Sequence, residues 1–184
     1  HTAQFLTSKG ARLVAVADSA GAVHNPAGLD VAALLELKNA GKSVADYPDG
    51  TRLDKDDVID VECDIWIPAA RPDVVNENNV HRLKTRLVVE GANIPFTLGA
   101  EEYLHERGVI CIPDFIANAG GVICAAVEVA GGRKRDAFAA IDERPEKAQT
   151  RRQPGKRGCQ RTQHGGDGSR GFCIDRHAEG AELD

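Results

Sequence analysis

The stretch Val109–Val129, VICIPDFIANAGGVICAAVEV, contains residues that could bind a ligand. Its β-branched start, Val109–Ile112, predicts a buried strand, and the apolar segment Val122–Val129 predicts a helix. Asn118 is expected in the turn between them, where its amide offers donors and an acceptor to a carboxamide or a ribose hydroxyl. The two glycines that follow, Gly120-Gly121, have no Cβ, so a flat ligand or a neighbouring backbone can come close to the chain there.

Three further predicted strands also end next to polar or small residues. The strands are Arg12–Ala17, Asp64–Ile67 and Arg86–Glu90, and the residues that follow them include Asp18 and Ser19, Ala69 and Ala70, and Asn93. Helical segments connect the strands, a pattern that predicts an α/β, Rossmann-like, doubly wound parallel sheet with helices on both faces. Because such sheets bind ligands at the carboxyl ends of their strands, we expect these residues and Asn118 to form one row along a cofactor cleft.

Asp18 has two possible roles. An acidic residue at the end of the second strand of a dinucleotide-binding fold accepts hydrogen bonds from the adenosine ribose hydroxyls. The same carboxylate would repel a 2′-phosphate, so in this role Asp18 favours NAD over NADP. The alternative is that Asp18 only caps the turn Ser19-Ala20-Gly21, and from the residues alone this second role is the commoner outcome.

The glycine-rich turn that usually accompanies such an acid is missing. A G-x-G-x-x-G turn should lie roughly 20 residues before the acid, and the position of Asp18 leaves too little room for it. We therefore expect the chain to begin inside the first helix of the dinucleotide fold, without the first strand and the helix N-terminus that bind pyrophosphate. The absence of Met from all 184 residues also predicts that the sequence is a fragment of a longer protein.

Composition and charge narrow the class of protein. The net charge of −5 does not suggest a nucleic-acid-binding domain. No apolar run approaches the roughly 20 residues of a membrane helix, and there is no signal peptide, so we expect a cytoplasmic protein without a membrane partner. The acidic run Asp54–Asp60 is expected to be a solvated face. Cys63, Cys111 and Cys124 lie in apolar patterns and are expected to be buried free thiols.

The composition changes from about Arg144 onward, where Pro, Gly and Arg are frequent and apolar periodicity is weak. We predict a partial dinucleotide-binding domain over residues 1–143 and an atypical basic tail over 144–184, disordered or translated from a shifted frame. The tail contains four residues of the types that can bind a metal, Cys159, His164, Cys173 and His177, with the spacing C-x4-H-x8-C-x3-H. This spacing fits no common zinc module, so no metal is predicted. The tail's arginines could touch nucleic acid non-specifically, but nothing predicts a dedicated site.

Three motifs, in their order along the chain, resemble one protein family. VADSAGAVHNPAGLD at Val16–Asp30, VVEGANIP at Val88–Pro95 and PDFIANAGGV at Pro113–Val122 resemble the cofactor-binding domain of the glutamate/leucine/phenylalanine/valine dehydrogenases. The motifs are most similar to those of the glutamate dehydrogenases. The resemblance extends from about Thr2 to about Ile141.

The resemblance implies an NAD-binding part of an amino-acid dehydrogenase. Such enzymes oxidatively deaminate L-glutamate or a related L-amino acid to the 2-oxo acid and ammonium. The residues that the resemblance places on the cofactor are Asp18, Ser19, Ala69, Ala70, Asn93 and Asn118. The acid/base lysine and aspartate of the family belong to its amino-terminal domain, so no catalytic residue is predicted here. The parent enzyme is expected to be a homo-oligomer.

Two alternatives remain open at this stage. A serine that helps to hold the substrate's side-chain carboxylate in glutamate enzymes corresponds here to Ala125, which cannot donate a hydrogen bond. An apolar amino acid, as in the leucine, valine and phenylalanine enzymes, is therefore a possible substrate. The other alternative is a truncated, non-catalytic remnant, which the missing glycine turn favours.

Overall fold

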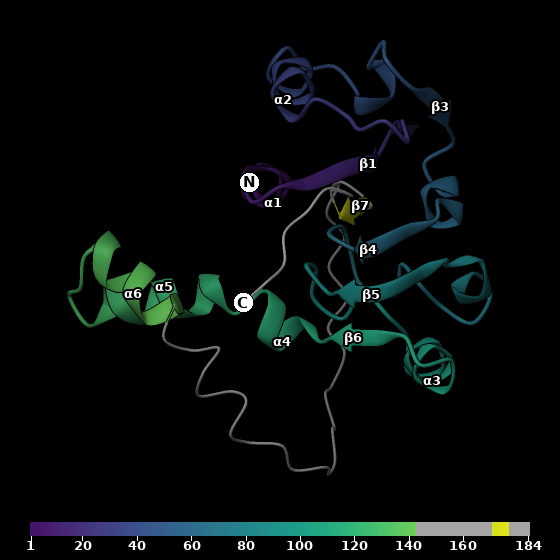
Figure 1. Cartoon of the computed structure of the whole chain (residues 1–184). Coiled ribbons are helices and arrows are strands. Elements are labelled where there is room, and N and C mark those ends of the chain that lie inside the picture. The colour runs from purple at the N-terminus through teal and green to yellow at the C-terminus, as the bar shows by residue number, and fades with distance from the viewer. Residues whose placement is uncertain (143–170, 177–184) are drawn as a thin grey trace.

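The computed structural model describes residues 1–142 and 171–176 (Figure 1). The helices are α1 Thr2–Ser8, α2 Val31–Asn39, α3 Leu98–Glu106, α4 Asp114–Ala117, α5 Gly120–Val129 and α6 Lys134–Asp142, with 3-10 turns η1 Val44–Asp46, η2 Asp57–Asp60 and η3 Val80–Arg82. The strands are β1 Ala11–Asp18, β2 Gly21–His24, β3 Thr51–Leu53, β4 Cys63–Ile67, β5 Thr85–Val89, β6 Ile110–Ile112 and β7 Gly171–Arg176.

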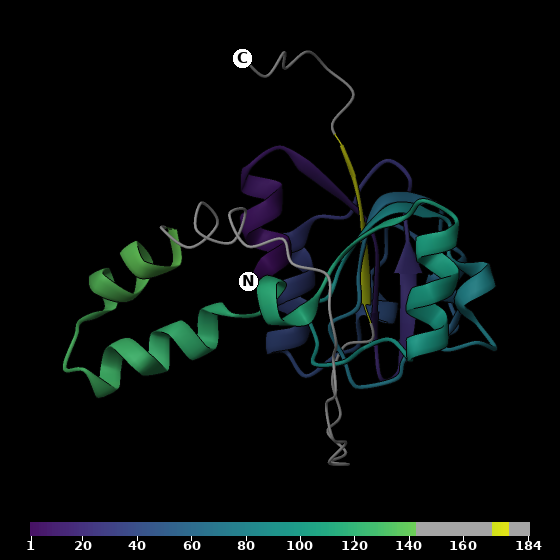
Figure 2. The same ribbon diagram turned by 90° about the horizontal axis from the view of Figure 1, so that it is seen from below.

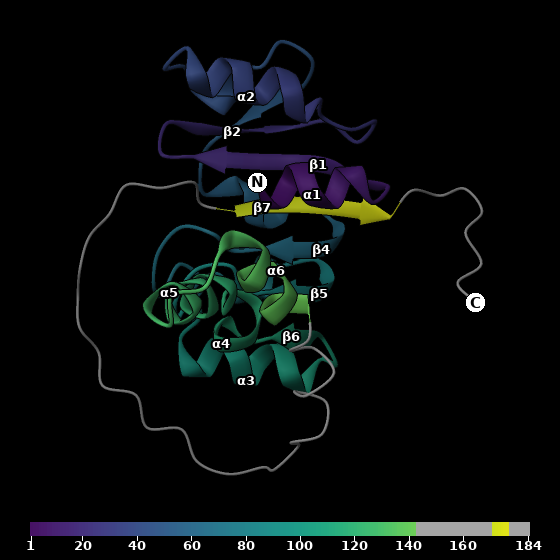
Figure 3. The ribbon, with the colours of Figure 1, turned by 90° about the vertical axis from the view of Figure 1, so that its left-hand side faces the viewer.

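All seven strands form one sheet, in the order β3-β2-β1-β7-β4-β5-β6 (Figure 3). The strands β4, β5 and β6 pair in parallel, with Ile65 opposite Leu87 and Val88 opposite Cys111. The other pairings are antiparallel, because β1 turns directly into β2 as a hairpin and β7 runs against both of its neighbours. The α/β, Rossmann-like expectation is confirmed, but the sheet is mixed where a wholly parallel one was expected.

The strand β7 comes from the segment that the sequence predicted to be a basic tail. It lies between β1 and β4 (Figure 3), pairing Leu13 and Ile65 with Ile174. Cys173 and Ile174 are fully buried. A strand was not expected here because only a few apolar residues stand between polar and glycine-rich stretches. The division of the chain at residue 143 stays a prediction.

Helices cover both faces of the sheet, as the alternation of strands and helices predicted. On one face, α1 and α2 pack through a cluster that includes Leu6, Leu13, Leu34, Ile67 and Ile174. On the other face, η2, η3 and α3 pack through a cluster that includes Val58, Trp66, Val80, Phe96 and Leu104. Trp66 is 1% exposed and its ring meets that of Phe96 edge-on, so it belongs to the core.

Side chains at the helix ends explain where two of the predicted helices begin. The Asp30 carboxylate accepts from the amides of Ala32 and Ala33 at 2.8 and 3.2 Å and begins α2. The Thr97 hydroxyl caps α3 in the same way. By contrast, between β4 and β5, where a helical connection was expected, only short elements such as the three-residue turn η3 form.

The chain after β6 differs from the predicted strand, turn and helix. The short helix α4 intervenes, and α5 and α6 then pack against each other and project away from the sheet (Figure 2). Cys63 is buried, whereas Cys111 and Cys124 are only half-buried, which corrects the expectation for those two thiols. None of the helices in residues 1–142 is long and apolar enough to cross a membrane.

Candidate functional site

The loops that follow β4, β5 and β6 meet at the carboxyl edge of the sheet. The amide of Ala92 donates to the carbonyl of Pro68 at 2.8 Å, and the amide of Ile94 donates to the Asp114 carboxylate at 2.7 Å. Ile94 adopts a left-handed backbone with φ 48°, which is strained for a β-branched residue. Strained backbone of this kind is frequent at ligand-binding sites, so this edge of the sheet is a candidate binding site.

A pocket of about 540 Å³ opens beside the carboxyl end of β1. Its apolar wall includes Leu13, Val16, Val31 and Leu34. The polar and small residues that line it include Asp18, Ser19, Lys38 and Ala69. The structure thus brings three of the sequence-predicted residues into one pocket, whose size and mixed lining suit an organic ligand. Ala70 follows Ala69 in the chain and is half-buried.

The Asp18 carboxylate is saturated by the protein itself. Its Oδ1 accepts from the Ser43 hydroxyl at 2.8 Å and from the amide of Ala20 at 3.0 Å. Its Oδ2 accepts from the Lys38 ammonium at 2.8 Å and from the amide of Val44 at 3.0 Å. A carboxylate has about four acceptor positions, so the arrangement seen here leaves none for a ribose hydroxyl. Asp18 has the turn-capping role that the residues alone favoured.

Burial and these four donors also determine the ionisation of Asp18. Burial raises its pKa, but the hydrogen bonds from Lys38, Val44, Ser43 and Ala20 outweigh this effect and lower the pKa to about 2. The side chain is only 7% exposed. Asp18 is therefore a buried anion at neutral pH, and it holds β1, α2 and η1 together below the pocket.

The two asparagines of the predicted row do come together. Asn118 Nδ2 donates to Asn93 Oδ1 at 2.7 Å, which links the loop after β5 to the junction between α4 and α5. Asn93 is exposed and Asn118 is half-buried. Both amides keep further donors or acceptors for a ligand, since each side chain has more than one hydrogen-bonding position.

The glycines beside Asn118 have a smaller role than expected. Gly120 and Gly121 are the first residues of α5, and a Cβ on Gly121 would meet nothing within 4 Å. The predicted close approach of another backbone is absent at both positions. Ala125 is exposed on the projecting helix α5 and lies outside the pocket beside β1.

Sequence reasoning missed Lys38 and Glu90. Lys38 lies near the end of α2, and only the fold brings its ammonium to Asp18, at 2.8 Å. Glu90 follows β5, is 3% exposed and accepts from the amide of Asp114 at 3.1 Å. Burial raises the pKa of the Cys111 thiol to about 11, and the charges of Glu90 and Glu101 add to this effect. A charged residue directly after an apolar strand was the available signal for Glu90.

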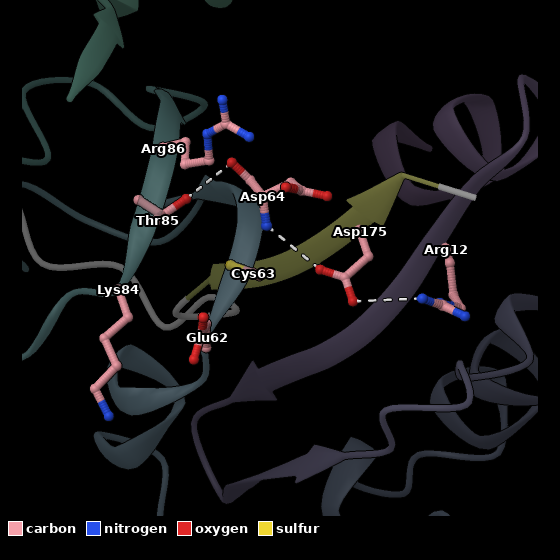
Figure 4. A pocket seen from close by; sticks show the side chains of 8 residues that line it. All are labelled: Arg12, Glu62, Cys63, Asp64, Lys84, Thr85, Arg86 and Asp175. Carbon is pink, nitrogen blue, oxygen red and sulfur yellow. Dashed lines mark hydrogen bonds and ion pairs between the residues drawn. The ribbon is translucent and has the colours of Figure 1, made fainter. Parts of the chain in front are cut away.

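A larger hollow of about 710 Å³ lies at the opposite edge, beside the amino ends of β4 and β5 (Figure 4). Its charged lining residues are Arg12, Lys84 and Arg86 together with Glu62, Asp64 and Asp175. Asp175 forms an ion pair with Arg12 at 3.7 Å and accepts from the amide of Asp64 at 3.3 Å. Because the opposite charges balance and no predicted site residue lines it, this hollow is the weaker candidate.

Metal ligands do not gather in the described ranges. No group of three or more His, Cys, Asp or Glu side chains there is placed to hold an ion. Four Cys and His residues were considered as zinc ligands. Cys173 is buried in β7, and Cys159, His164 and His177 lie outside the described residues.

The chain is of the open α/β class, whose members bind ligands outside the carboxyl ends of their strands, and the pocket beside β1 lies at that edge. Comparison with known families then identifies the chain more closely. The model of the glutamate/leucine/phenylalanine/valine dehydrogenase family matches residues 1–153, and the chain belongs to this family.

Individual relatives agree with the family. The chain is 42% identical to the NADP-specific glutamate dehydrogenase of Saccharolobus shibatae over 132 residues, which cover 72% of this chain and 31% of that protein. It is 40% identical to the NADP-specific glutamate dehydrogenase A1 of Halobacterium salinarum over 134 residues, covering 72% and 32%. The chain thus spans about a third of the length of these relatives. Their names oppose the expected preference for NAD over NADP.

A solved structure also matches. The hetero-hexameric glutamate dehydrogenase from Thermus thermophilus, determined in a leucine-bound form, superposes with a TM-score of 0.65 and 25% identity. The match covers 80% of this chain and 38% of that one. The fold and the family therefore agree.

Proposed function

We propose that this chain is the nicotinamide-cofactor-binding part of an amino-acid dehydrogenase. The observation that carries the proposal is the carboxyl edge of the sheet, where the pocket beside β1 reaches Ala69 after β4 and hydrogen bonds join the loops that follow β4, β5 and β6. Its apolar wall suits an adenine ring, and Ser19, Asn93 and Asn118 offer polar groups to riboses or to a carboxamide. Small side chains at Ala69 and Ala70 leave the backbone between these two parts accessible.

The proposed reaction of the whole enzyme is oxidative deamination of L-glutamate or a related L-amino acid to the 2-oxo acid and ammonium. When bound, the nicotinamide ring supplies hydride chemistry. The contribution of this chain is to hold and orient the ring against the substrate, since the protein's role in such enzymes is binding, orientation and electrostatics. No residue of this chain is given a catalytic role, and the 184 residues alone are expected to bind cofactor without turnover.

Two finer properties belong to the same proposal. The substrate class has two alternatives. The names of the relatives favour L-glutamate, whereas Ala125, which has no hydroxyl to bind a carboxylate, favours an apolar amino acid. The assembled enzyme is proposed to be an oligomer, because the glutamate dehydrogenase from T. thermophilus is hetero-hexameric.

Titration of the chain with NADH and with NADPH, followed by nicotinamide fluorescence, tests the proposal. We expect a saturable change in fluorescence, weaker in Asn93→Ala and unchanged in Asn78→Ala, an exposed asparagine that does not line the pocket beside β1. The absence of any change up to about 1 mM of either cofactor, the upper end of ordinary KM values, would contradict the proposal. The chain would then be better described as a non-binding remnant.

A further inference from the structure

The strand β7 fills a gap that is one strand wide in the middle of the sheet. It lies between β1 and β4 and pairs with both in the antiparallel sense, so these two neighbours run in the same direction (Figure 3). We call this gap, bounded by Ala11–Asp18 of β1 and Cys63–Ile67 of β4, the acceptor groove. Without a strand in it, the facing N–H and C=O groups of β1 and β4 would be unpaired, and unpaired strand edges bind extended peptides.

The acceptor groove also recognises the side chains of the strand that fills it. Cys173 and Ile174 are fully buried, one in each of the two apolar clusters on the opposite faces of the sheet. Gly171 adopts φ 150°, and a Cβ at this position would lie 3.2 Å from the carbonyl oxygen of Ile67 and 3.4 Å from the ring of Trp66. This end of the groove therefore favours glycine, which has no Cβ.

Charge selects the strand at the other end of the groove. Asp175 forms an ion pair with Arg12 of β1 at 3.7 Å and accepts from the amide of Asp64 of β4 at 3.3 Å (Figure 4). The acceptor groove thus fits an extended segment with glycine in its first position, apolar residues in its third and fourth, and an acid in its fifth. The segment Gly171–Arg176 has this pattern, and every copy of the chain carries it.

The length of chain before β7 permits this segment to reach a second molecule. Residues 143–170 connect α6 to β7. At about 3.3 Å per residue, a connection of this length spans roughly 90 Å when fully extended. A domain of about 150 residues has a radius of gyration of only about 15 Å. The acceptor groove of a neighbouring copy is therefore within reach of β7.

We propose that the acceptor groove binds the β7 segment of a second copy of this chain as well as the chain's own, so that two copies exchange their β7 strands and form a dimer. The dimer has two-fold symmetry, because each copy donates one strand and receives one. The contacts inside the groove are the same in the monomer and in the dimer. Protein concentration therefore sets the balance, against an effective concentration of the tethered strand of the order of 1 mM. This dimer does not depend on the proposed function.

The experiment swaps the charges of the Arg12–Asp175 pair between two copies of the full chain. Their side chains are 33% and 27% exposed, so a change of charge is tolerated there. Arg12→Asp alone places two acids together in its own groove, and Asp175→Arg alone places two bases together. When the two variants are mixed, only the exchange of β7 brings opposite charges together, and it does so in both grooves. Analytical ultracentrifugation measures the fraction of dimer.

Two controls separate exchange from other association. The double variant, Arg12→Asp with Asp175→Arg, has matching charges within one copy and gains nothing from exchange. A mixture of Arg52→Asp and Asp46→Arg has the same net charges as the test mixture. It swaps an exposed ion pair, 3.9 Å apart, that lies outside the acceptor groove and β7. Far-UV circular dichroism verifies that each variant is folded.

We expect the test mixture to dimerise about tenfold or more strongly than the double variant, because an ion pair replaces a like-charge contact at two sites. At about 0.1 mM protein, roughly half of the mixture should then sediment as dimer. Each variant alone and both controls should sediment mainly as monomers at this concentration. Raising the salt concentration should reduce the difference, because partly exposed charges are screened.

Three outcomes would overturn the exchange of β7. In the first, the test mixture forms no more dimer than the double variant. In the second, the mixture of Arg52→Asp and Asp46→Arg dimerises equally, which would place the contact at another surface. The third concerns single variants that do not fold alone: exchange requires that mixing them restores the folded circular dichroism signal, and a mixture that stays unfolded contradicts it.

Discussion

Two parts of the carboxyl edge contain similar polar side chains but have opposite environments. At the end of β1, the residue Asp18 is 5% exposed, and its carboxylate accepts hydrogen bonds from four donors of the protein. In the loop after β5 and at the junction between α4 and α5, Asn93 and Asn118 form a single hydrogen bond near the surface. In sequence, both parts have a polar residue just after an apolar strand, and both were expected to contact a cofactor.

The difference shows how burial assigns the roles. A buried charge is costly unless its partners are provided by the protein, so Asp18 has its partners built in and contributes to stability. Exposed amides can exchange water or each other for a ligand at little cost. We infer that the Asp18 end organises the site and that the asparagine end is available for contact. The following experiments test this comparison, from the largest expected effect to the smallest.

Replacing Asp18 with Asn should have the largest effect. The substitution removes the negative charge that faces Lys38. It also replaces one carboxylate oxygen, which accepts hydrogen bonds, with an NH₂ group that faces the protein's own donors. We therefore expect the free energy of unfolding to fall by about 1–3 kcal/mol in urea titrations. Asp30→Asn is the matched control, because Asn caps a helix about as well as Asp and Asp30 is exposed. Equal effects at the two positions would contradict the structural role of Asp18.

The stability that Asp18 contributes should disappear in acid. Its pKa is lowered in the folded chain from 3.8 to about 2, so folding favours the ionised form. This contribution is complete above pH 4 or so and is lost as the pH falls through about 2. Measured at a series of pH values, the difference in unfolding free energy between the unmodified chain and Asp18→Asn should shrink over this range. A difference that stays constant between pH 5 and 2 would rule out this ionisation as the cause.

Replacing Lys38 with Gln should destabilise the chain less than Asp18→Asn does. Lys38 is half-exposed and Asp18 keeps three other donors, so we expect a loss of about 0.2–1 kcal/mol, the usual range for an exposed ion pair. Thermal or urea unfolding measures it, with Lys42→Gln as the control. A loss larger than that of Asp18→Asn would show that the ammonium, and not the set of four donors, holds the carboxylate.

The asparagine pair should contribute least to stability. We expect Asn93→Ala and Asn118→Ala each to lower the unfolding free energy by less than about 0.5 kcal/mol, because the bond between them is near the surface. Under the proposed function, the same variants should weaken NADPH binding by about threefold to tenfold. A double-mutant cycle measures the coupling free energy between the two asparagines. A coupling as large as that of a buried hydrogen-bond network would mean that this pair supports the structure as Asp18 does, and the two parts of the edge would then not differ.

Much of the fold could be predicted from local signals. Asp30 and Thr97 mark the starts of α2 and α3, and the apolar runs over β1, β4, β5 and β6 predicted these strands. The expectation that the last of them is buried was wrong, because β6 lies at the edge of the sheet and its Ile110 is 65% exposed. The strands β2 and β3 escaped because short, glycine-flanked segments have no clear period. The strand β7 escaped because its burial depends on neighbours more than 100 residues away in sequence, such as Trp66 opposite Cys173.

For the site, residue types and order were enough to predict the row along the carboxyl edge. They were not enough to distinguish a ligand contact from an internal support, and this is why Asp18 was read as favouring NAD and why Lys38 and Glu90 were missed. Their roles depend on which donors approach from other elements, such as Ser43 and Val44 on Asp18.

The sequence by itself determined the family, the alternation of strands and helices, and the edge at which the loops converge, because these follow from local periodicity, capping and motif order. Only the tertiary structure decided that β7 occupies the centre of the sheet, that Asp18 is a saturated buried anion, and that Lys38 presents the charge to the pocket. These features arise from burial and from contacts between residues distant in the chain, which no local pattern encodes.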